Sequence, residues 1–498
     1  MKKLVLTVLL IVISCKGMIA FAQENAKLAF ASVLQSNMVV QQNKPFKVWG
    51  TAPAGETVTI QADWMQQPVK VVADKESKFL CIIPVPEAKK GNFSKHVVTA
   101  SVNKGSITLN NLLIGDVWIC SGQSNMQFGM KETIDVAKEL PAANYPYIRL
   151  FYGGLNFSNE PVGNIKGSWQ ECTPQTAHNF SAVAYHFGRE LHTTLDIPIG
   201  IIFTGIGASA AQAYVPREVL AADTMLNRVY LQPYLNSPKS NEKIDGGFSF
   251  EKVTRPYLLY NAVIHPFTNL TIKGFTWYQG ESNRMERESY TRLTQNMIES
   301  WRKKFEQGSL PFYYVQVAPF WYDKGDSTLA DYAFFREAQE NISDLANTEM
   351  VITMDVGEAK DLHPKNKKPI GMRLAKTALN RTYGMLQVAY QEPKYDYVEY
   401  AKNKAVVHFE PESVQSGLET TDGQAPKYFY MAGADQKFYP AKATIQDNRI
   451  VLTSPQVKRP VAVRYAFTNF PVTNLQNKNG FPALPFRTDN WPEIKSVK

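Results

Sequence analysis

Ser124 stands where a chain could present a nucleophile. It follows an apolar run at 112–120 and a Ser121-Gly122 turn, and a stretch that could begin a helix, 125–138, comes directly after it. A strand, a tight glycine turn, a serine and a helix can lift a hydroxyl to the carboxyl edge of a sheet. Backbone N–H groups at the start of that helix could face a developing negative charge. The plain alternative is a serine that caps a helix.

Other polar residues follow the later apolar runs. Gly207 lies in a loop of small residues after the second run, and Gln279 and Asn283 lie in a polar loop after the third. Asp361 and His363 follow the fifth run. Because the carboxyl ends of parallel strands share one sheet edge, all of these residues could meet the serine there.

Together these residue types fit acyl transfer from an ester. The reaction needs a nucleophile, a base of near-neutral pKa, a carboxylate that orients the base, and donors for the oxyanion. His363 is the preferred base, because the other histidines fall in predicted helices, β segments or an insertion, or ahead of the third strand. Asp361 could turn back to its imidazole Nδ1. Taken singly, each residue has an ordinary explanation as a turn glycine, a loop amide or a capping histidine.

The elements that must position these residues alternate between strands and helices from 112 to 383. Five short apolar strands separated by helices predict an α/β fold with a central, mostly parallel, five-stranded sheet covered on both faces. The expected strands are 112–120, 199–204, 272–277, 312–317 and 350–354, and the expected helices are 182–194, 290–305, 332–345 and 370–382. Two irregular insertions, 152–175 and 217–250, could form walls or lids over the site edge.

Regions with β patterning flank this alternating part. Short strands separated by turn residues occupy 23–111 and predict a β-sandwich. β patterning returns over 384–498, either as a small sandwich of its own or as added strands for the first one. The expected domains are therefore 23–111, 112–383 and 384–498.

The N-terminus, residues 1–22, has the pattern of a secretory signal. Two lysines precede an apolar run, and a small-x-small site ends at Ala22. We expect cleavage after Ala22 and a secreted or periplasmic protein. The alternative is a lipoprotein box that would leave a lipidated Cys15 at the mature N-terminus. No other stretch is long and apolar enough to cross a membrane.

Composition excludes several classes of protein. The formal net charge of the 498 residues is +9, and the basic residues are scattered, which argues against a nucleic-acid partner. No Cys/His spacing suggests zinc and no Asp-rich loop suggests calcium, so we expect no metal or other cofactor. Cys81, Cys120 and Cys172 are too few for a disulfide framework, although one bridge among them could form. Nothing in the sequence predicts an oligomeric state.

Three motifs resemble a known family. The segments 122–126 (Gly-Gln-Ser-Asn-Met), 277–283 (Trp-Tyr-Gln-Gly-Glu-Ser-Asn) and 361–364 (Asp-Leu-His-Pro) look like the sialate O-acetylesterase family of SGNH hydrolases, which are carbohydrate esterases. Further similar segments are 34–42, 44–50, 260–266 and 485–489. The resemblance covers nearly the whole mature chain and implies an SGNH-type α/β sandwich for 112–383.

The resemblance also implies roles for the residues already singled out. Ser124 would be the nucleophile, His363 the base, and Asp361 the partner that orients it. We then expect a serine esterase that removes O-acetyl groups from a carbohydrate, with sialic acid as the substrate that the resemblance supplies, through an acetyl-Ser124 intermediate. One alternative is an esterase for acetylated xylan or another glycan. An alternative from a different class is a carbohydrate-binding protein without turnover, against which the intact Ser, Asp and His argue.

The oxyanion hole is the least determined part of the expected site. Backbone N–H groups of Ser124 and Gly207 would form it, with Gln279 as the first choice of side-chain donor and Asn283 as the second. The family usually has a Gly-Gly pair where Ala208 follows Gly207 in this chain.

Overall fold

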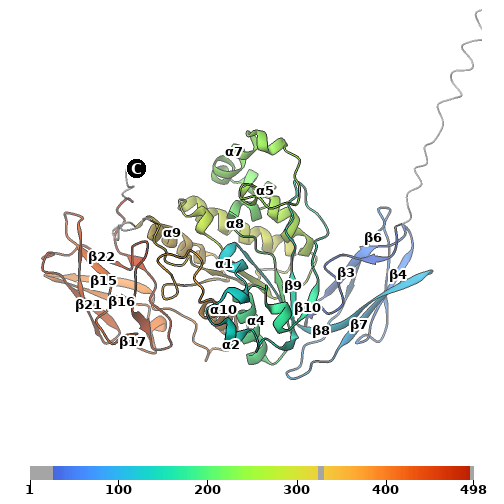
Figure 1. Cartoon of the computed structure of the whole chain (residues 1–498), viewed down its shortest axis with the longest axis horizontal. Coiled ribbons are helices and arrows are strands. Elements are labelled where there is room, and N and C mark those ends of the chain that lie inside the picture. Colours follow the sequence, from blue (N-terminus) through green and yellow to red (C-terminus); the bar gives the residue numbers. More distant parts are fainter. Residues whose placement is uncertain (1–25, 323–329, 494–498) are drawn as a thin grey trace, which may run out of the picture.

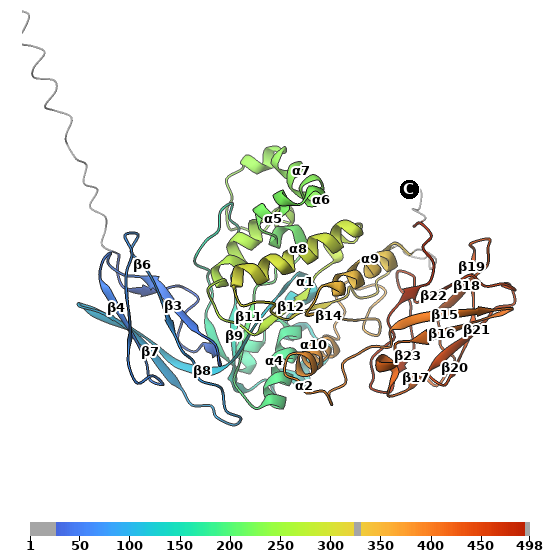
Figure 2. The same ribbon diagram turned by 180° about the vertical axis from the view of Figure 1, so that it is seen from behind.

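The computed structural model describes residues 26–322 and 330–493. The predicted leader, with Ala22 and Cys15, lies outside this part of the chain. Figure 1 shows a central α/β region with a β region at either side, and Figure 2 shows the same arrangement from behind.

The N-terminal β region contains two small antiparallel groups of strands. One group has the order β1-β3-β6, and in the other β4 lies between β5 and β7. The bounds are β1 Ala29–Phe30, β3 Phe46–Thr51, β4 Thr57–Ala62, β5 Val69–Val72, β6 Lys78–Ile83 and β7 His96–Val102. Buried and exposed residues alternate along β6, as a strand with one solvent-facing side requires.

One long strand, β8 (Gly105–Gly122), connects this region to the centre of the molecule. Its first part pairs with β7, and its second part lies between two parallel strands of the central sheet. From Leu112 onward every residue of β8 is buried, which is usual for a central parallel strand. The predicted boundary between 111 and 112 falls inside this strand, and the domain limits stay predictions.

The central sheet is mixed, with the order β10-β9-β11-β8-β12-β13-β14. All neighbours in it are parallel except β10 and β9. The bounds are β9 Tyr145–Tyr152, β10 Trp169–Cys172, β11 Ile199–Phe203, β12 Gly274–Tyr278, β13 Phe312–Val315 and β14 Thr348–Val351; β2, Val39–Gln41, pairs with β8 as a side branch.

The expected five-stranded sheet was too small, because β9 adds a sixth parallel strand. Arg149 interrupts the apolar pattern of β9, yet its side chain is fully buried. The guanidinium donates hydrogen bonds to the carbonyls of Pro146 and Asn37 and to the side-chain oxygen of Asn111. A buried arginine whose N–H groups find these acceptors can lie in a core strand. A strand that contains a charged residue, however, does not have the apolar sequence expected of a core strand.

Helices cover both faces of the central sheet (Figures 1 and 2). α4 and α10 pack together on one face with Trp118 and Cys120 of β8, whereas α8 lies on the other face with Val117 and Ile119. This alternation along β8 is the two-residue period of a strand buried on both sides. The principal helices are α4 Ala182–Leu195, α8 Glu288–Phe305, α9 Asp331–Glu340 and α10 Lys368–Arg381; short helices are α2 Val136–Glu139, α3 Pro174–Ala177, α5 Arg217–Ala222, α6 Thr224–Leu226 and α7 Gln232–Leu235.

The C-terminal β region forms sheets of its own, which decides between the two arrangements that the sequence left open. Two sheets have the orders β15-β16-β21-β20 and β19-β18-β22-β24, and β17 pairs with β23. The bounds are β15 Tyr395–Ala401, β16 Lys404–Phe409, β17 Leu418–Thr420, β18 Phe429–Ala432, β19 Phe438–Pro440, β20 Lys442–Gln446, β21 Arg449–Thr453, β22 Ala462–Tyr465, β23 Leu475–Asn477 and β24 Phe486–Arg487.

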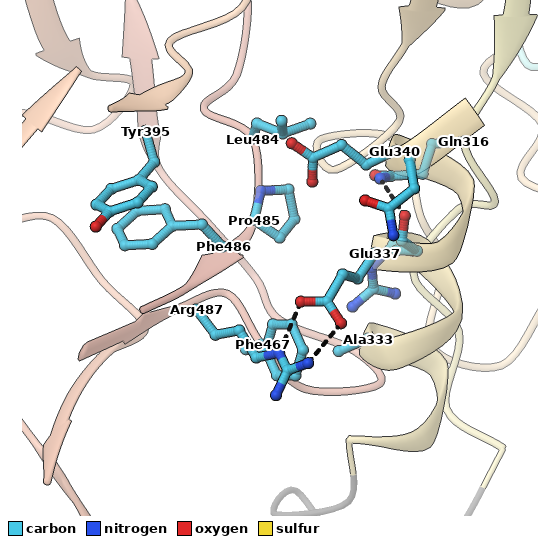
Figure 3. A pocket seen from close by; sticks show the side chains of 12 residues that line it. Gln316, Ala333, Glu337, Glu340, Tyr395, Phe467, Leu484, Pro485, Phe486 and Arg487 are labelled. Atoms are coloured by element: carbon cyan, nitrogen blue, oxygen red, sulfur yellow. Dashed lines mark hydrogen bonds and ion pairs between the residues drawn. The ribbon is translucent and has the colours of Figure 1, made fainter. Parts of the chain in front are cut away.

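A small cavity lies where α9 meets the C-terminal β region (Figure 3). Its volume is about 170 Å³, and Glu340, Tyr395 and Phe486 are among the residues that line it. Arg487 pairs with Glu337 across this contact. The cavity therefore belongs to the junction between the two regions.

The described residues also bear on the expectations for disulfides, membrane-spanning segments and metal sites. Cys81, Cys120 and Cys172 are all buried and free, so the one bridge considered among them does not form. Within 26–322 and 330–493 no helix has the length and apolarity needed to cross a bilayer. The same residues contain no group of three or more His, Cys, Asp or Glu side chains placed to hold a metal ion.

Candidate active site

A close approach of two strands determines where Ser124 stands. Gly122, the last residue of β8, lies opposite Tyr278 of β12 and has a φ of 142°. A Cβ on Gly122 would fall 2.1 Å from the Tyr278 carbonyl oxygen, so no side chain fits there. The N–H of Gln123 then donates to the same carbonyl at 2.9 Å. The chain turns off the sheet at this point and presents Ser124 at its edge.

The helix that begins at Ser124 is much shorter than expected. α1 spans Ser124–Gln127, where the sequence predicted a helix over 125–138. Gln123 is its N-cap residue, so Ser124 is not the capping serine of the plain alternative. Ser124 is half-buried.

Ser124 and His363 are in contact. The distance from Ser124 Oγ to His363 Nε2 is 2.8 Å, a hydrogen bond between a hydroxyl and an imidazole nitrogen. The two residues are 239 positions apart in the sequence; Ser124 begins α1 after β8, and His363 lies in the loop after β14. A hydroxyl beside a base in this geometry can be activated as a nucleophile.

Asp361 lies beside His363 but contacts a different atom from the one expected. Its Oδ1 accepts a hydrogen bond from the backbone N–H of His363 at 2.8 Å. Among the described residues, its carboxylate has no hydrogen bond to the imidazole Nδ1. Asp361 therefore fixes the backbone of the His363 loop, and its charge raises the pKa of His363.

A buried network lies beneath the Ser124–His363 pair. Asn125 donates to Glu281 Oε1 at 2.5 Å and to the Leu362 carbonyl at 3.1 Å, and its Oδ1 accepts from Lys367 Nζ at 2.5 Å. One amide thereby connects the nucleophile helix, the loop after β12 and the loop that carries His363. The Lys367 ammonium also lies 4.7 Å from the centre of the Phe128 ring, a favourable cation–π position.

Burial shifts the ionisation of this network. The pKa of Lys367 falls to about 7, and the pKa of Glu281 rises, because burial disfavours the charged form of each. The pKa of His363 is lowered, first by burial and then by the positive charge of Lys367, while Asp361 and Glu132 oppose the shift. A histidine with a lowered pKa stays neutral, and able to accept a proton, to a lower pH.

The backbone donors expected for an oxyanion lie beside Ser124. The Ser124 N–H begins α1, and no described residue accepts a hydrogen bond from it. The Gly207 N–H donates at 2.8 Å to Oε1 of Gln127. The amide oxygen of Gln127 is therefore bonded to the N–H that is expected to stabilise the oxyanion. Ala208, where the family usually has glycine, adopts a left-handed φ of 60°. The methyl group at this position costs some strain, but the backbone conformation is still reached.

The two candidate side-chain donors are fully engaged elsewhere. Gln279 Nε2 donates to the Ser209 carbonyl at 3.1 Å and to Asn283 Oδ1 at 2.7 Å. Asn283 Nδ2 donates to Gln212 Oε1 at 3.0 Å and to Glu286 Oε1 at 2.9 Å. Both side chains are buried, and neither has an amide N–H left for a substrate. In this conformation they hold the loop after β12 in shape.

Sequence reasoning missed three residues that shape the site. Gln123 accepts hydrogen bonds from the N–H groups of Gly280 and Ser282, at 3.2 and 3.3 Å, and so joins two motifs. Asn125 and Lys367 make the network described above. Gln123 and Asn125 flank the serine in the first motif, which was a usable signal, whereas nothing near Lys367 in the sequence indicates that it is buried.

Comparisons with known proteins agree with this geometry. A family model described as a carbohydrate esterase, sialic acid-specific acetylesterase, matches residues 243–380. The crystal structure of a carbohydrate acetylesterase from Xanthomonas citri is 31% identical, covers 93% of this chain and 100% of that chain, and superposes with a TM-score of 0.83. The chain belongs to the sialate O-acetylesterase family.

Mammalian members of this family align with nearly the full length of the chain. The sialate O-acetylesterase of Mus musculus is 28% identical, with 92% of this chain and 93% of the mouse protein covered. The Homo sapiens sialate O-acetylesterase is 26% identical, with coverages of 96% and 97%. The protein is therefore a carboxylic ester hydrolase of the carbohydrate O-acetylesterase type, with a mixed α/β fold and added β sheets.

The engaged amides of the loop after β12 lead to a prediction about stability. Gln279→Ala and Asn283→Ala each leave buried polar partners unsatisfied, which costs about 1–3 kcal/mol of unfolding free energy. We expect both variants to unfold at lower denaturant concentration while the folded fraction keeps kcat within about tenfold. A folded Gln279→Ala enzyme with a kcat loss of about 10² or more would instead mark it as an oxyanion donor.

Asp361 permits a test that separates its charge from its hydrogen bond. Asp361→Asn keeps an oxygen for the His363 N–H but removes the charge that raises the pKa of His363. We expect the acid limb of the kcat/KM profile to move to lower pH, with a smaller loss of kcat than Ser124→Ala causes. Asp361→Ala, which removes both contributions, should lose more. An upward shift of the acid limb in Asp361→Asn would contradict this electrostatic effect of Asp361 on His363.

Lys367 should shift the pH profile in the opposite direction. Lys367→Met keeps a side chain of similar length but removes the positive charge that lowers the pKa of His363. We expect the acid limb of kcat/KM to move to higher pH and kcat to fall, because Asn125 loses a partner. Lys368→Met is the control, since the Lys368 ammonium binds Glu139 at 2.6 Å instead. Equal acid limbs in Lys367→Met and wild-type enzyme would exclude this influence of Lys367.

Proposed function

We propose that this esterase removes O-acetyl groups from sialic acid through an acetyl-enzyme on Ser124. The observation that carries the proposal is the 2.8 Å contact between Ser124 Oγ and His363 Nε2. This contact puts a hydroxyl within proton-transfer reach of a base. The choice of sugar is supported by the mouse and human relatives, which are sialate O-acetylesterases.

In the first half-reaction, Ser124 Oγ bonds to the acetyl carbonyl carbon while His363 Nε2 takes the hydroxyl proton. The electron pair of the carbonyl moves to its oxygen, which becomes the oxyanion. The N–H groups of Ser124 and Gly207 stabilise that charge. The bond to the sugar oxygen then breaks, and His363 returns the proton to the departing sugar hydroxyl.

In the second half-reaction, water repeats these steps on the acetyl-enzyme. His363 takes a proton from water, and the resulting oxygen nucleophile attacks the acetyl carbon. The bond to Ser124 Oγ breaks, and the proton passes to Ser124 as acetic acid leaves. Water is the only co-reactant, so atoms and charges balance.

Gln127 must give way during this cycle. Its Oε1 accepts from the Gly207 N–H in the free enzyme, and its Nε2 donates to the Tyr152 hydroxyl at 3.1 Å. The carbonyl oxygen of a bound acetyl group would replace Gln127 Oε1 on that N–H. The half-buried position of Gln127 leaves its side chain room to turn outward.

We also propose that the protein is exported. The leader pattern of residues 1–22 supports this, with cleavage after Ala22 as the favoured outcome and a lipidated Cys15 as the alternative. The intact mass of the mature protein distinguishes these two forms, because only the second carries a lipid.

The function is tested by acetate release from 9-O-acetylated sialic acid, acetylated xylan and a small acetyl ester. We expect a higher kcat/KM for the acetylated sialic acid than for acetylated xylan. Ser124→Ala and His363→Ala should each lower kcat on every substrate by about 10⁴-fold or more, because the pair acts as a unit. His178→Ala, which alters an exposed histidine outside the site, is the matched control.

Two results would contradict these expectations. Turnover near the wild-type rate in folded Ser124→Ala or His363→Ala would overturn the mechanism. A clear preference for acetylated xylan would leave the mechanism in place and overturn the choice of sugar.

A further inference from the structure

Arg284 lies on the loop after β12 and has no anionic partner among the residues that the structure describes. It follows the turn Glu281–Asn283 after β12 and is half-buried. Its Nε is buried and has no hydrogen-bond acceptor in the described part of the chain. No carboxylate in 26–322 or 330–493 forms an ion pair or hydrogen bond with its guanidinium. Arg287, three residues on, pairs instead with Glu493 through two hydrogen bonds of 3.0 and 2.6 Å.

An aromatic ring holds the Arg284 side chain in place. The guanidinium carbon lies 4.4 Å from the centre of the Tyr322 ring. Edge-to-face contacts with Phe320 and Tyr332 fix that ring in turn. A ring over one face of a guanidinium leaves the terminal N–H groups, which lie in the plane of the guanidinium, able to donate.

Contacts along two loops connect Arg284 to the reacting pair. Ser282, two residues earlier, donates its N–H to Gln123 Oε1 at 3.3 Å and its hydroxyl to the Ala208 carbonyl at 3.0 Å. Gln123 and Ala208 are the immediate neighbours of Ser124 and Gly207. Arg284 thus belongs to the loop that contacts the residues next to the nucleophile and the backbone donor.

The loop that carries Tyr322 also reaches the site. The Trp321 N–H donates to the Ala359 carbonyl at 3.2 Å, in the segment that leads to Asp361 and His363. The Arg284–Tyr322 pair therefore bridges two loops that surround the site. A stacked arginine held by such a bridge needs little reordering to bind an anion, which favours affinity.

We infer that Arg284 binds the carboxylate of the acetylated sugar and makes the enzyme selective for an acidic sugar. The inference rests on the proposed function and adds to it a residue that recognises the substrate class. Sialic acid carries a carboxylate that is ionised at neutral pH, and a guanidinium matches the planar geometry of a carboxylate with two parallel hydrogen bonds. Acetylated xylan built from neutral xylose offers no such group.

The acetyl ester and the carboxylate lie apart in the substrate. In a 9-O-acetylated sialic acid, the glycerol side chain and part of the ring lie between the acetyl ester and the carboxylate. The ester and the carboxylate must therefore contact different parts of the site. Ser124 begins α1, directly after β8, and Arg284 lies on the loop after β12, the neighbouring strand.

The test compares 9-O-acetyl-N-acetylneuraminic acid with its C1 carboxamide, which keeps the shape but removes the negative charge. Acetate release gives kcat/KM for both compounds with wild-type enzyme, Arg284→Gln and Arg284→Lys. We expect wild-type enzyme to prefer the acid by about 10–100-fold, the usual value of a hydrogen bond to a charged group. Arg284→Gln should lose this preference, and Arg284→Lys should keep part of it, because an ammonium supplies charge without the paired geometry.

Arg287→Gln is the matched control, since it removes the same charge from the same loop at a residue that pairs with Glu493. It should keep the wild-type ratio between acid and carboxamide. Equal kcat/KM for the two compounds in wild-type enzyme, or an unchanged ratio in Arg284→Gln, would overturn the role of Arg284 alone. The wild-type comparison needs no variant to fold. No acetate from either compound would overturn the choice of sialic acid, and the role of Arg284 with it.

Discussion

The approach of β8 to β12 at Gly122 is the constraint on which the site depends. A residue with a side chain would collide there with the Tyr278 carbonyl, which lies 2.1 Å from the Cβ position. Because the two strands approach closely at this point, the Gln123 N–H can donate a hydrogen bond to the Tyr278 carbonyl of β12. Ser124 then follows at the edge of the sheet. The glycine of the motif around the serine is therefore required by the packing of the two strands, whatever the chemistry of the serine.

Side-chain amides connect the loops of the site, and nearby charges set the pKa of His363. Gln123 and Asn125, on either side of the nucleophile, each bind the loop after β12, and Asn125 also reaches the His363 loop. The pKa of His363 then reflects two opposed influences. Burial and Lys367 lower it, whereas Asp361 and Glu132 raise it. A histidine with a lowered pKa stays unprotonated, and able to act as a base, to a lower pH than an ordinary histidine.

Much of this arrangement could be predicted from the sequence, because strand ends in a parallel sheet gather at one edge. That rule brought Ser124 and His363 together, and the structure places them in hydrogen-bond contact. The rule does not give the direction of a side chain within a loop: the amide of Gln279, the first choice of oxyanion donor, bonds in this structure to Ser209 and Asn283. The sequence does not predict strand β9, because the buried Arg149 interrupts its apolar pattern.

In the proposed mechanism the acetyl group passes through Ser124. Rapid acid quenching during turnover of 9-O-acetylated sialic acid, followed by peptide mass spectrometry, tests this step most directly. The expected result is an acetylated peptide with the modification at Ser124, present during turnover, gone once the substrate is exhausted, and absent in Ser124→Ala. Steady acetate release by wild-type enzyme with no acetyl group on Ser124 at any time, under quenching conditions that preserve acetyl esters, would contradict it.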